Sequence, residues 1–371
     1  MYIHEQLDWP RFHWNRKRLA ERLPSVRHQQ GRLLGHMEAL GFKLQQEAVL
    51  QTLTDDALKS SEIEGEKLDA GQVRSSIALR LGIDIAGLKP ADRNVDGIVE
   101  MLLDATRHYD QPLTAERLFA WHASLFPSGR SGMIRIRTGA WRDDGNGPMQ
   151  VVSGSIGREH VHFEAPSAAR LDQELRPFLN WFNADAGTDA VLKAGLAHLW
   201  FVTLHPFEDG NGRIARAIAD MALARADGTK DRFYSMSSQI AEERKEYYRE
   251  LEIAQRGDLD ITGWQAWFLD CLSRAIDGAD ELLAAVLHKA KLWQHINRKP
   301  VNERQQLVIN RLLDDFKGFL TTSKYAKLAK CSPDTALRDI RELLSRGILV
   351  QNPSGGRSTS YRLAEPENIT A

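Results

Sequence analysis

The apolar positions of this chain recur mostly every three to four residues, a spacing that is typical of amphipathic helices. The pattern predicts helices over residues 30–60, 92–109, 170–183, 190–204, 211–226, 240–256 and 263–290. The stretch 191–204 is apolar on nearly every face, which is typical of a helix buried at the centre of a bundle. We therefore predict a mainly α fold.

Two short stretches depart from this helical pattern. Residues 149–152 and 160–164 are extended in character and are separated by Gly154 and Gly157, so they predict a β-hairpin. Within the second stretch, His160 and His162 lie two residues apart and share one face of the strand. Two imidazoles are compatible with a metal site, but the sequence shows no third ligand, so an ordinary surface strand is the favoured interpretation.

Pro300 interrupts the helical pattern and predicts a domain boundary near residues 297–302. Beyond it, helices are predicted over residues 303–316, 322–330 and 333–346, followed by a hairpin with Gly355 and Gly356 at its tip. Ser332 and Pro333 predict the N-cap and the first residue of the third helix. We expect three domains, at residues 1–90, 91–295 and 296–371.

Composition excludes some classes of protein. The 371 residues are 42% hydrophobic and 27% charged, with a net charge of −1, so the chain as a whole does not attract nucleic acid electrostatically. Residues 301–363, however, hold 11 Lys and Arg against 6 Asp and Glu. The N-terminus is too polar for a signal peptide, and no run approaches the ~20 apolar residues of a membrane span. With only two cysteines, we expect a cytoplasmic protein that does not insert into membranes.

Residues 205–216, HPFEDGNGRIAR, bring together several groups suited to phosphate chemistry. Gly210 and Gly212 stand at the start of a predicted helix, where backbone N–H groups bind anions. Arg213 and Arg216 are three residues apart and point to one side, so two guanidinium groups can hold successive phosphates. The Asp209 carboxylate is a ligand for Mg²⁺, and the imidazole of His205 is a general base near neutral pH.

This segment resembles the Fic motif, His-Pro-Phe-x-Asp/Glu-Gly-Asn-Gly-Arg-x-x-Arg, at every specified position. The resemblance extends over about residues 92–290: TGAWR at 138–142 resembles a signature upstream of Fic cores, and the hairpin at 149–164 resembles the family's flap. It implies a Fic helical bundle behind a helical N-terminal region. The first ~51 residues resemble a domain of unassigned function found ahead of bacterial Fic cores.

The resemblance implies a protein adenylyltransferase, which transfers AMP from ATP to a Ser, Thr or Tyr hydroxyl of a target protein, or of itself. By position, His205 would take the hydroxyl proton and Asp209 would bind Mg²⁺. Arg213 and Arg216 would hold the β- and γ-phosphates, and the target would dock at the 149–164 flap. The residues that the resemblance assigns to the ATP site are Phe207, Gly210, Asn211, Gly212, Arg213 and Arg216.

Residues 60–65, SSEIEG, resemble the Ser/Thr-x-x-x-Glu-Gly/Asn pattern of the inhibitory helix in regulated Fic proteins. The resemblance places this helix around residues 55–66. It implies that Glu64, followed by Gly65, forms a salt bridge with Arg216 and so competes with the γ-phosphate, while Ser60 fixes the helix by a local hydrogen bond. In the alternative interpretation, Glu64 is only a surface charge.

Residues 303–363 resemble a winged helix, with Thr335, Arg338 and Arg341 on the outer face of its third helix and Arg357 at the tip of the hairpin. Such modules bind DNA, here through residues 333–346 and the wing at 350–362, or they dock proteins or form homodimers. A second hypothesis is therefore a DNA-binding transcription regulator whose Fic core senses nucleotide or modifies the regulator. A third keeps the enzyme but changes the transferred group to phosphate or phosphocholine.

Overall fold

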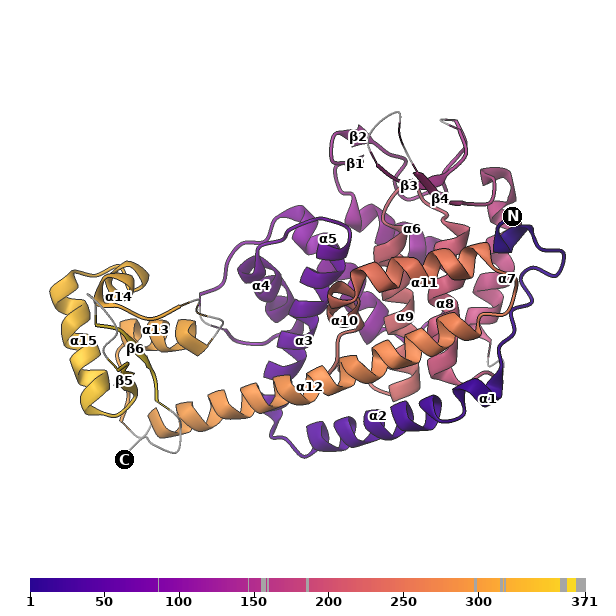
Figure 1. Cartoon of the computed structure of the whole chain (residues 1–371). Helices are drawn as coiled ribbons and strands as arrows, with labels where there is room; N and C mark the ends of the chain where they lie inside the picture. Colours follow the sequence, from indigo (N-terminus) through magenta and orange to yellow (C-terminus); the bar gives the residue numbers. More distant parts are fainter. Residues whose placement is uncertain are drawn as a thin grey trace. The chain divides into compact units, whose positions relative to one another are not determined.

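The computed structural model describes residues 1–364 except 86, 146, 155–157, 159, 185–186, 297–298, 314–315, 317 and 354–358. The chain divides into two compact units, Met1–Asp280 and Glu281–Ala371, which are described separately (Figure 1). The division falls within one helix, α12 (Thr262–Ile296). The three-domain division expected from the sequence stays a prediction.

The first unit is mainly helical, which confirms the predicted fold class. Its α-helices besides α12 are α1 (Arg16–Leu19), α2 (Arg22–Glu38), α3 (Phe42–Ile63), α4 (Ala70–Leu81), α5 (Arg93–Arg107), α6 (Ala115–Leu125), α7 (Leu171–Asn183), α8 (Ala190–Leu204), α9 (Asn211–Asp227), α10 (Met236–Glu242) and α11 (Arg244–Arg256). Two short 3₁₀ helices, η1 (Ile3–Glu5) and η2 (Ala168–Arg170), complete the set of described helices in this unit.

Two of the predicted helices are wrong as single elements. The chain over residues 30–60 forms α2 and α3, because Gly41 adopts an extended conformation (φ −65°, ψ 149°) as the N-cap of α3. The chain over residues 240–256 forms α10 and α11, which meet at Glu243. The apolar spacing continues across both breaks, so periodicity alone could not reveal them. The prediction also missed α4 and α6.

Helices α8 and α9 pack side by side and carry the 205–216 segment between them (Figure 1). Every residue from Ala194 to Leu204 is buried, as the apolar pattern of this stretch predicts. α8 begins at Asp189, whose side chain accepts a hydrogen bond from the N–H of Val191. It ends at His205, which takes the left-handed conformation (φ 48°, ψ 55°) and turns the chain toward α9. The loop from His205 to Gly210 therefore connects two buried helices.

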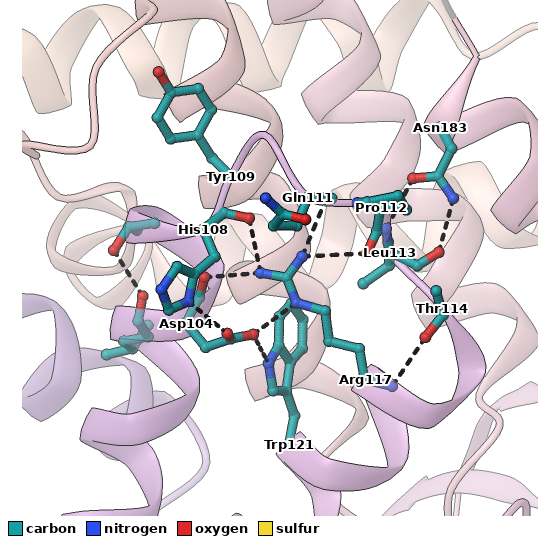
Figure 2. A network of polar contacts seen from close by, with 12 residues as sticks. Asp104, His108, Tyr109, Gln111, Pro112, Leu113, Thr114, Arg117, Trp121 and Asn183 are labelled. Atoms are coloured by element: carbon teal, nitrogen blue, oxygen red, sulfur yellow. Dashed lines mark hydrogen bonds and ion pairs between the residues drawn. The ribbon is translucent and has the colours of Figure 1, made fainter.

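A polar network joins α5 to α6 at the edge of this core (Figure 2). The Arg117 guanidinium donates to the Asp104 carboxylate at 2.6 Å and to the backbone carbonyls of Asp104, His108 and Gln111. Trp121 Nε1 donates to the same carboxylate at 2.6 Å. Burial opposes the charge of Asp104, but hydrogen bonds from Arg117 and His108 hold the pKa of its carboxyl below the usual range. Arg117 therefore adds hydrogen bonds to carbonyl groups at the end of α5 and in the turn that follows it.

The C-terminal half of α3 is anchored in the core of the first unit. Leu50, Leu53 and Ala57 are buried. The buried carboxylate of Asp56 accepts hydrogen bonds from Ser235 Oγ at 2.6 Å and from the N–H of Ser237 at 3.3 Å, at the start of α10. These contacts hold the C-terminal half of α3 against the start of α10.

The predicted β-hairpin is confirmed. β3 (Gln150–Ser153) pairs antiparallel with β4 (His160–Glu164), with Ser153 opposite His160 and an irregularity between Val151 and Val152. Gly154 follows β3 with a φ of 108°, and Gly157 lies outside the described residues. A second hairpin, β1 (Arg130–Ser131) and β2 (Ile134–Arg135), was not predicted, because two-residue strands carry no detectable alternation.

The second unit contains α13 (Glu303–Leu313), α14 (Thr322–Leu328), α15 (Pro333–Ser345) and a hairpin of β5 (Leu349–Gln351) and β6 (Tyr361–Leu363). Ser332 caps α15 by accepting from the N–H of Thr335, and Pro333 begins the helix, as the sequence predicts. Ala336, Ile340 and Leu343 face the core of this unit. Its identity as a winged helix stays a prediction, and Gly355, Gly356 and Arg357 lie outside the described residues.

None of the helices that the structure describes is both long enough and apolar enough to cross a membrane.

Candidate active site

His205 follows the last residue of α8, and one nitrogen of its ring is hydrogen-bonded to the backbone. Its Nδ1 is 3.2 Å from the carbonyl oxygen of Val202. Because a carbonyl only accepts, Nδ1 carries the hydrogen, and Nε2 of the neutral ring has a free lone pair. Burial lowers the pKa of His205 to about 4. The imidazole is therefore neutral at physiological pH and able to accept a proton at Nε2.

The backbone around His205 is held by Arg142, whose side chain is completely buried. Arg142 Nε donates to the carbonyl oxygen of His205 at 2.8 Å, and the N–H of Arg142 donates to the carbonyl of Pro206 at 2.9 Å. The guanidinium also donates to the carbonyl of Pro166 and to the Asp144 carboxylate. The TGAWR stretch picked out in the sequence thus supplies the residue that fixes the start of the loop.

The side chains of Phe207 and Asn211 hold the loop against the core. The Phe207 ring is fully buried and stacks on the His122 ring, with centroids 4.2 Å apart and planes 6° apart. The Asn211 amide accepts from the N–H of Phe207 at 3.0 Å and donates to its carbonyl at 2.8 Å. Both residues, which the resemblance assigns to the ATP site, are thus engaged in supporting the loop, and the backbone polar groups of Phe207 are both bound to the Asn211 amide.

The N-terminus of α9 has the form of an anion site. Gly210 occupies the N-cap with φ 78°, a conformation in which a Cβ would lie 2.9 Å from a ring atom of Phe126. A glycine has no side chain with which to cap the helix, so the N–H groups of the first turn are available to a phosphate. Asp209 precedes it, and its carboxylate accepts from the N–H of Gly210 at 2.6 Å and from the hydroxyl of Ser131. This partly buried carboxylate fits the hard oxygen ligand that Mg²⁺ prefers.

Both arginines of the motif are buried and paired with carboxylates near the end of α3. Arg216 Nη2 donates to Glu64 Oε1 at 2.8 Å, and Arg213 Nη1 donates to Glu66 Oε2 at 2.7 Å. The Glu64 side chain is 29% exposed and that of Glu66 is 47% exposed, whereas the arginine side chains are at most 4% exposed. Burial disfavours the charge of Arg216, but the Glu64 carboxylate offsets it and the pKa of the guanidinium is raised.

Ser60 has a different contact from the one expected. Its hydroxyl accepts from Arg216 Nε at 3.0 Å, and its carbonyl accepts from Arg216 Nη2 at 2.9 Å. Ser60 therefore binds the arginine directly instead of making a local bond within the helix. The approach of Glu64 also depends on Gly212, because a Cβ there would lie 2.2 Å from Glu64 Oε1. Gly65 follows with φ 86° and ends the helix.

A groove of about 480 Å³ runs from Asp209 to the β3–β4 hairpin. Glu208 borders it and accepts a hydrogen bond from the N–H of Arg137 at 3.1 Å. The groove is lined by Ser131, Ile134, Ile136, Asp143, Gly147, Pro148, Met149, Gln150, Val152, Glu208 and Asp209.

Sequence reasoning missed two partners of the motif. Glu66 pairs with Arg213, and Ser131 pairs with Asp209. Glu66 lies one residue beyond the SSEIEG pattern and could have been suspected as a second acid beside a second arginine. Ser131 stands in an unpredicted two-residue strand, and nothing in the sequence connects it with a residue 78 positions away.

Two family profiles match the chain. A domain of unknown function, DUF4172, matches residues 2–83, which extends beyond the ~51 residues for which a resemblance was noted. The Fic/DOC family matches residues 112–223, which include the whole 205–216 segment.

Curated relatives include protein adenylyltransferase Fic of Drosophila mojavensis and protein adenylyltransferase fic-1 of Caenorhabditis elegans. They are 24% and 28% identical over 221 and 200 residues, which are 58% and 53% of this chain. The matched stretch is only 39% and 35% of those relatives, so the chain spans less than half of their length.

The fold is shared with a solved structure. A crystal structure of a Fic family protein from Desulfovibrio desulfuricans covers 95% of this chain and 97% of its own, with a TM-score of 0.52 and 18% identity. The 205–216 motif and the profile match identify residues 112–223 as a domain of the Fic/DOC family.

Proposed function

We propose that this chain is a protein adenylyltransferase that is inhibited by its own helix α3. It transfers AMP from ATP to the hydroxyl of a Ser, Thr or Tyr side chain. The observation that carries the proposal is the arrangement along one loop: an unprotonated imidazole nitrogen at His205, an uncapped helix N-terminus at Gly210, and two buried guanidinium groups at Arg213 and Arg216. The names of the curated relatives support the same activity.

His205 accepts the proton of the attacking hydroxyl at Nε2. The new bond forms between that oxygen and the α-phosphorus, and the bond from the α-phosphorus to the bridging oxygen of the β-phosphate breaks, so pyrophosphate leaves. The low pKa of His205 keeps Nε2 unprotonated across the physiological range. Because Arg142 fixes the carbonyl of His205, the imidazole is positioned before the substrates arrive.

The negative charge of the phosphates is neutralised by groups that the fold positions before ATP binds. The first-turn N–H groups of α9 face the α- and β-phosphates, Arg213 pairs with the β-phosphate and Arg216 with the γ-phosphate. A Mg²⁺ held by Asp209 neutralises phosphate charge when bound. The backbone at Asn211 contributes donors, while its side chain keeps the loop closed.

The proposed inhibition is a competition between the Glu64 carboxylate and the γ-phosphate for Arg216. In the described conformation, the guanidinium binds Glu64 and both polar groups of Ser60. A γ-phosphate that needs the same guanidinium must displace the Glu64 carboxylate. Glu66 adds a second such contact at Arg213. Removing the carboxylate of Glu64 therefore raises activity, the reverse of an ordinary active-site substitution.

The β3–β4 hairpin is proposed to dock the target. The described sheet has two strands, and β3 borders the groove that reaches Asp209. An extended target segment laid along this edge would be held through main-chain hydrogen bonds, with one side chain directed toward the loop.

The test uses ATP labelled on either the α- or the γ-phosphate, with Mg²⁺ and a cell lysate as the source of targets. The forms compared are wild type, Glu64→Gly, and Glu64→Gly with His205→Ala. We expect α-label to enter protein strongly with Glu64→Gly, weakly with wild type, and at background level with the double variant. Entry of γ-label in place of α-label would show phosphoryl transfer and overturn the proposal.

A second candidate function rests on α15. Arg338 and Arg341 are exposed while Ala336 and Ile340 of the same helix are buried, so the helix presents cations to solvent. We propose DNA binding by this face as a secondary activity. Fluorescence anisotropy with a duplex of random sequence tests it: binding should weaken with salt and with Arg338→Ala and Arg341→Ala combined. Binding unaffected by the double variant would contradict it.

A further inference from the structure

The structure supplies the third ligand that the sequence lacked beside the two histidines of the hairpin. One ligand atom from each of His160, His162 and Glu252 lies within 4.8 Å of the others. His160 and His162 come from one face of β4, and their ring centroids are 4.6 Å apart. Glu252 comes from α11, 90 residues further along the chain. Chain topology, and not local sequence, therefore brings these three groups together.

The contacts of His162 resemble those of a metal-binding imidazole. Its Nδ1 lies 2.8 Å from Glu252 Oε2, and its Nε2 lies 2.6 Å from Ser153 Oγ on the paired strand. In metal sites, the ring nitrogen that does not bind the metal is usually held by a hydrogen-bond partner, which fixes the orientation of the ring. Ser153 is in position for that role, which leaves Nδ1 and the Glu252 oxygen on the same side of the ring.

Glu252 is also held from its other side. Arg256 lies 3.3 Å from Glu252 Oε1 and donates to the carbonyls of Val161 (2.7 Å) and His162 (3.0 Å). The arginine thus ties α11 to the backbone of β4 and fixes the carboxylate, with Oε2 directed toward the imidazole. Two of the three ligands, His162 and Glu252, are thus oriented by contacts within the fold.

We propose that His160, His162 and Glu252 form a binding site for a divalent transition metal, with Zn²⁺ as the favoured ion. Two imidazole nitrogens and one carboxylate oxygen are a ligand set that zinc accepts in tetrahedral sites, with the fourth position open to water. Ligand atoms about 2.0–2.1 Å from a tetrahedral zinc are roughly 3.3 Å apart. His162 Nδ1 and Glu252 Oε2, at 2.8 Å, need only separate slightly to admit the ion.

The consequence is a clamp between β4 and α11. Among the described residues, the polar contacts between these two elements are that of His162 with Glu252 and those of Arg256 with two β4 carbonyls. A metal would add a bond to His160 and strengthen the link at Glu252. None of the three ligands belongs to the 205–216 segment, so metal binding can be tested apart from the transfer chemistry proposed above.

The experiment titrates Co²⁺, as a spectroscopic probe for zinc, into the full-length chain after removal of metals with a chelator and of any affinity tag. We expect one equivalent to give the visible bands of four-coordinate Co²⁺, and Zn²⁺ to displace them. His160→Ala, His162→Ala and Glu252→Gln should each abolish saturable uptake, whereas Ser153→Ala should weaken it about tenfold.

The matched control is His108→Ala. His108 is also an exposed histidine beside a carboxylate, with Nδ1 2.9 Å from Asp104 Oδ1, but it belongs to no cluster of three potential ligands among the described residues. It should leave uptake unchanged. His160→Ala guards against a folding artefact, because His160 is exposed and its circular dichroism should match wild type. Absence of one-equivalent uptake by wild type, or uptake that survives in His160→Ala and His162→Ala, would overturn the proposal.

Discussion

The loop from His205 to Gly210 and the β3–β4 hairpin border the same groove, yet they are held in different ways. Buried side chains fix the loop: Arg142 binds the carbonyl of His205, and Asn211 binds both backbone groups of Phe207. In the hairpin, β3 is mostly exposed and Phe163 of β4 is buried; polar contacts tie the hairpin to α11 through His162, Glu252 and Arg256 and to His4 at Glu164. The difference indicates that the core presets the catalytic geometry, whereas the geometry for the target depends on a few surface contacts.

The largest effect is expected from the loop's general base. In the Glu64→Gly background, His205→Ala should lower the initial rate of AMP incorporation by about 10²–10⁴-fold, because it removes the imidazole that accepts the hydroxyl proton. The rate is measured with α-labelled ATP. His108→Ala, which alters an exposed histidine, should leave it unchanged. A rate unaffected by His205→Ala would contradict the assignment.

The packing of the loop should matter more to stability than that of the hairpin. Phe207→Ala removes a fully buried ring and should lower the free energy of unfolding by about 3–5 kcal/mol. Val152→Ala on β3, where the residue is 48% exposed, should cost less than about 0.5 kcal/mol. Urea unfolding of both variants measures the difference. Equal losses would mean that the loop is not supported by the core as described.

The core beneath the loop should also make stability depend on pH. Burial, and secondarily Arg216, lowers the pKa of His198 to about 3, below the ~6.5 of an unfolded chain. The unfolded state therefore binds more protons between these values, and stability falls as pH falls below about 6.5. By pH 5 this histidine should account for a loss of roughly 2 kcal/mol. His198→Gln should make the dependence shallower by that amount, as urea unfolding at pH 7 and pH 5 would show. An unchanged slope would contradict it.

The smallest effect concerns the attachment of the hairpin. Arg256→Ala removes two hydrogen bonds to β4 carbonyls and should destabilise the hairpin locally by about 1 kcal/mol. Hydrogen exchange should quicken over residues 150–164 and stay unchanged over residues 205–216. Arg249→Ala, on the same helix but bound to Glu246 and Glu250, is the control. Faster exchange in both regions would show that they are not held independently.

The sequence predicted the residues of the site more completely than it predicted the fold around them. The 205–216 segment is contiguous, so the spacing of its groups survives in the structure, and the Glu64–Arg216 contact follows from two short patterns. What the sequence could not supply are partners brought together by topology: Ser131 at Asp209, Arg142 at His205, and Glu252 at His162.

Breaks between helices were missed for a related reason. Apolar spacing reports which face is buried and not where the backbone turns, so the turn at Gly41 between α2 and α3 passed unnoticed. Hairpins were predicted where the strands have three to five residues and missed where they have two.

The central claim is that Glu64 restrains the enzyme by occupying Arg216, and a double-mutant cycle on the initial rate of AMP incorporation tests it most directly. In the wild-type background, Glu64→Gly should raise the rate by about 10- to 100-fold, the worth of one charge-assisted hydrogen bond. In an Arg216→Gln background, whose fold is verified by circular dichroism, Glu64→Gly should give no increase, because the group that Glu64 withholds is gone. The same increase in both backgrounds would contradict the account.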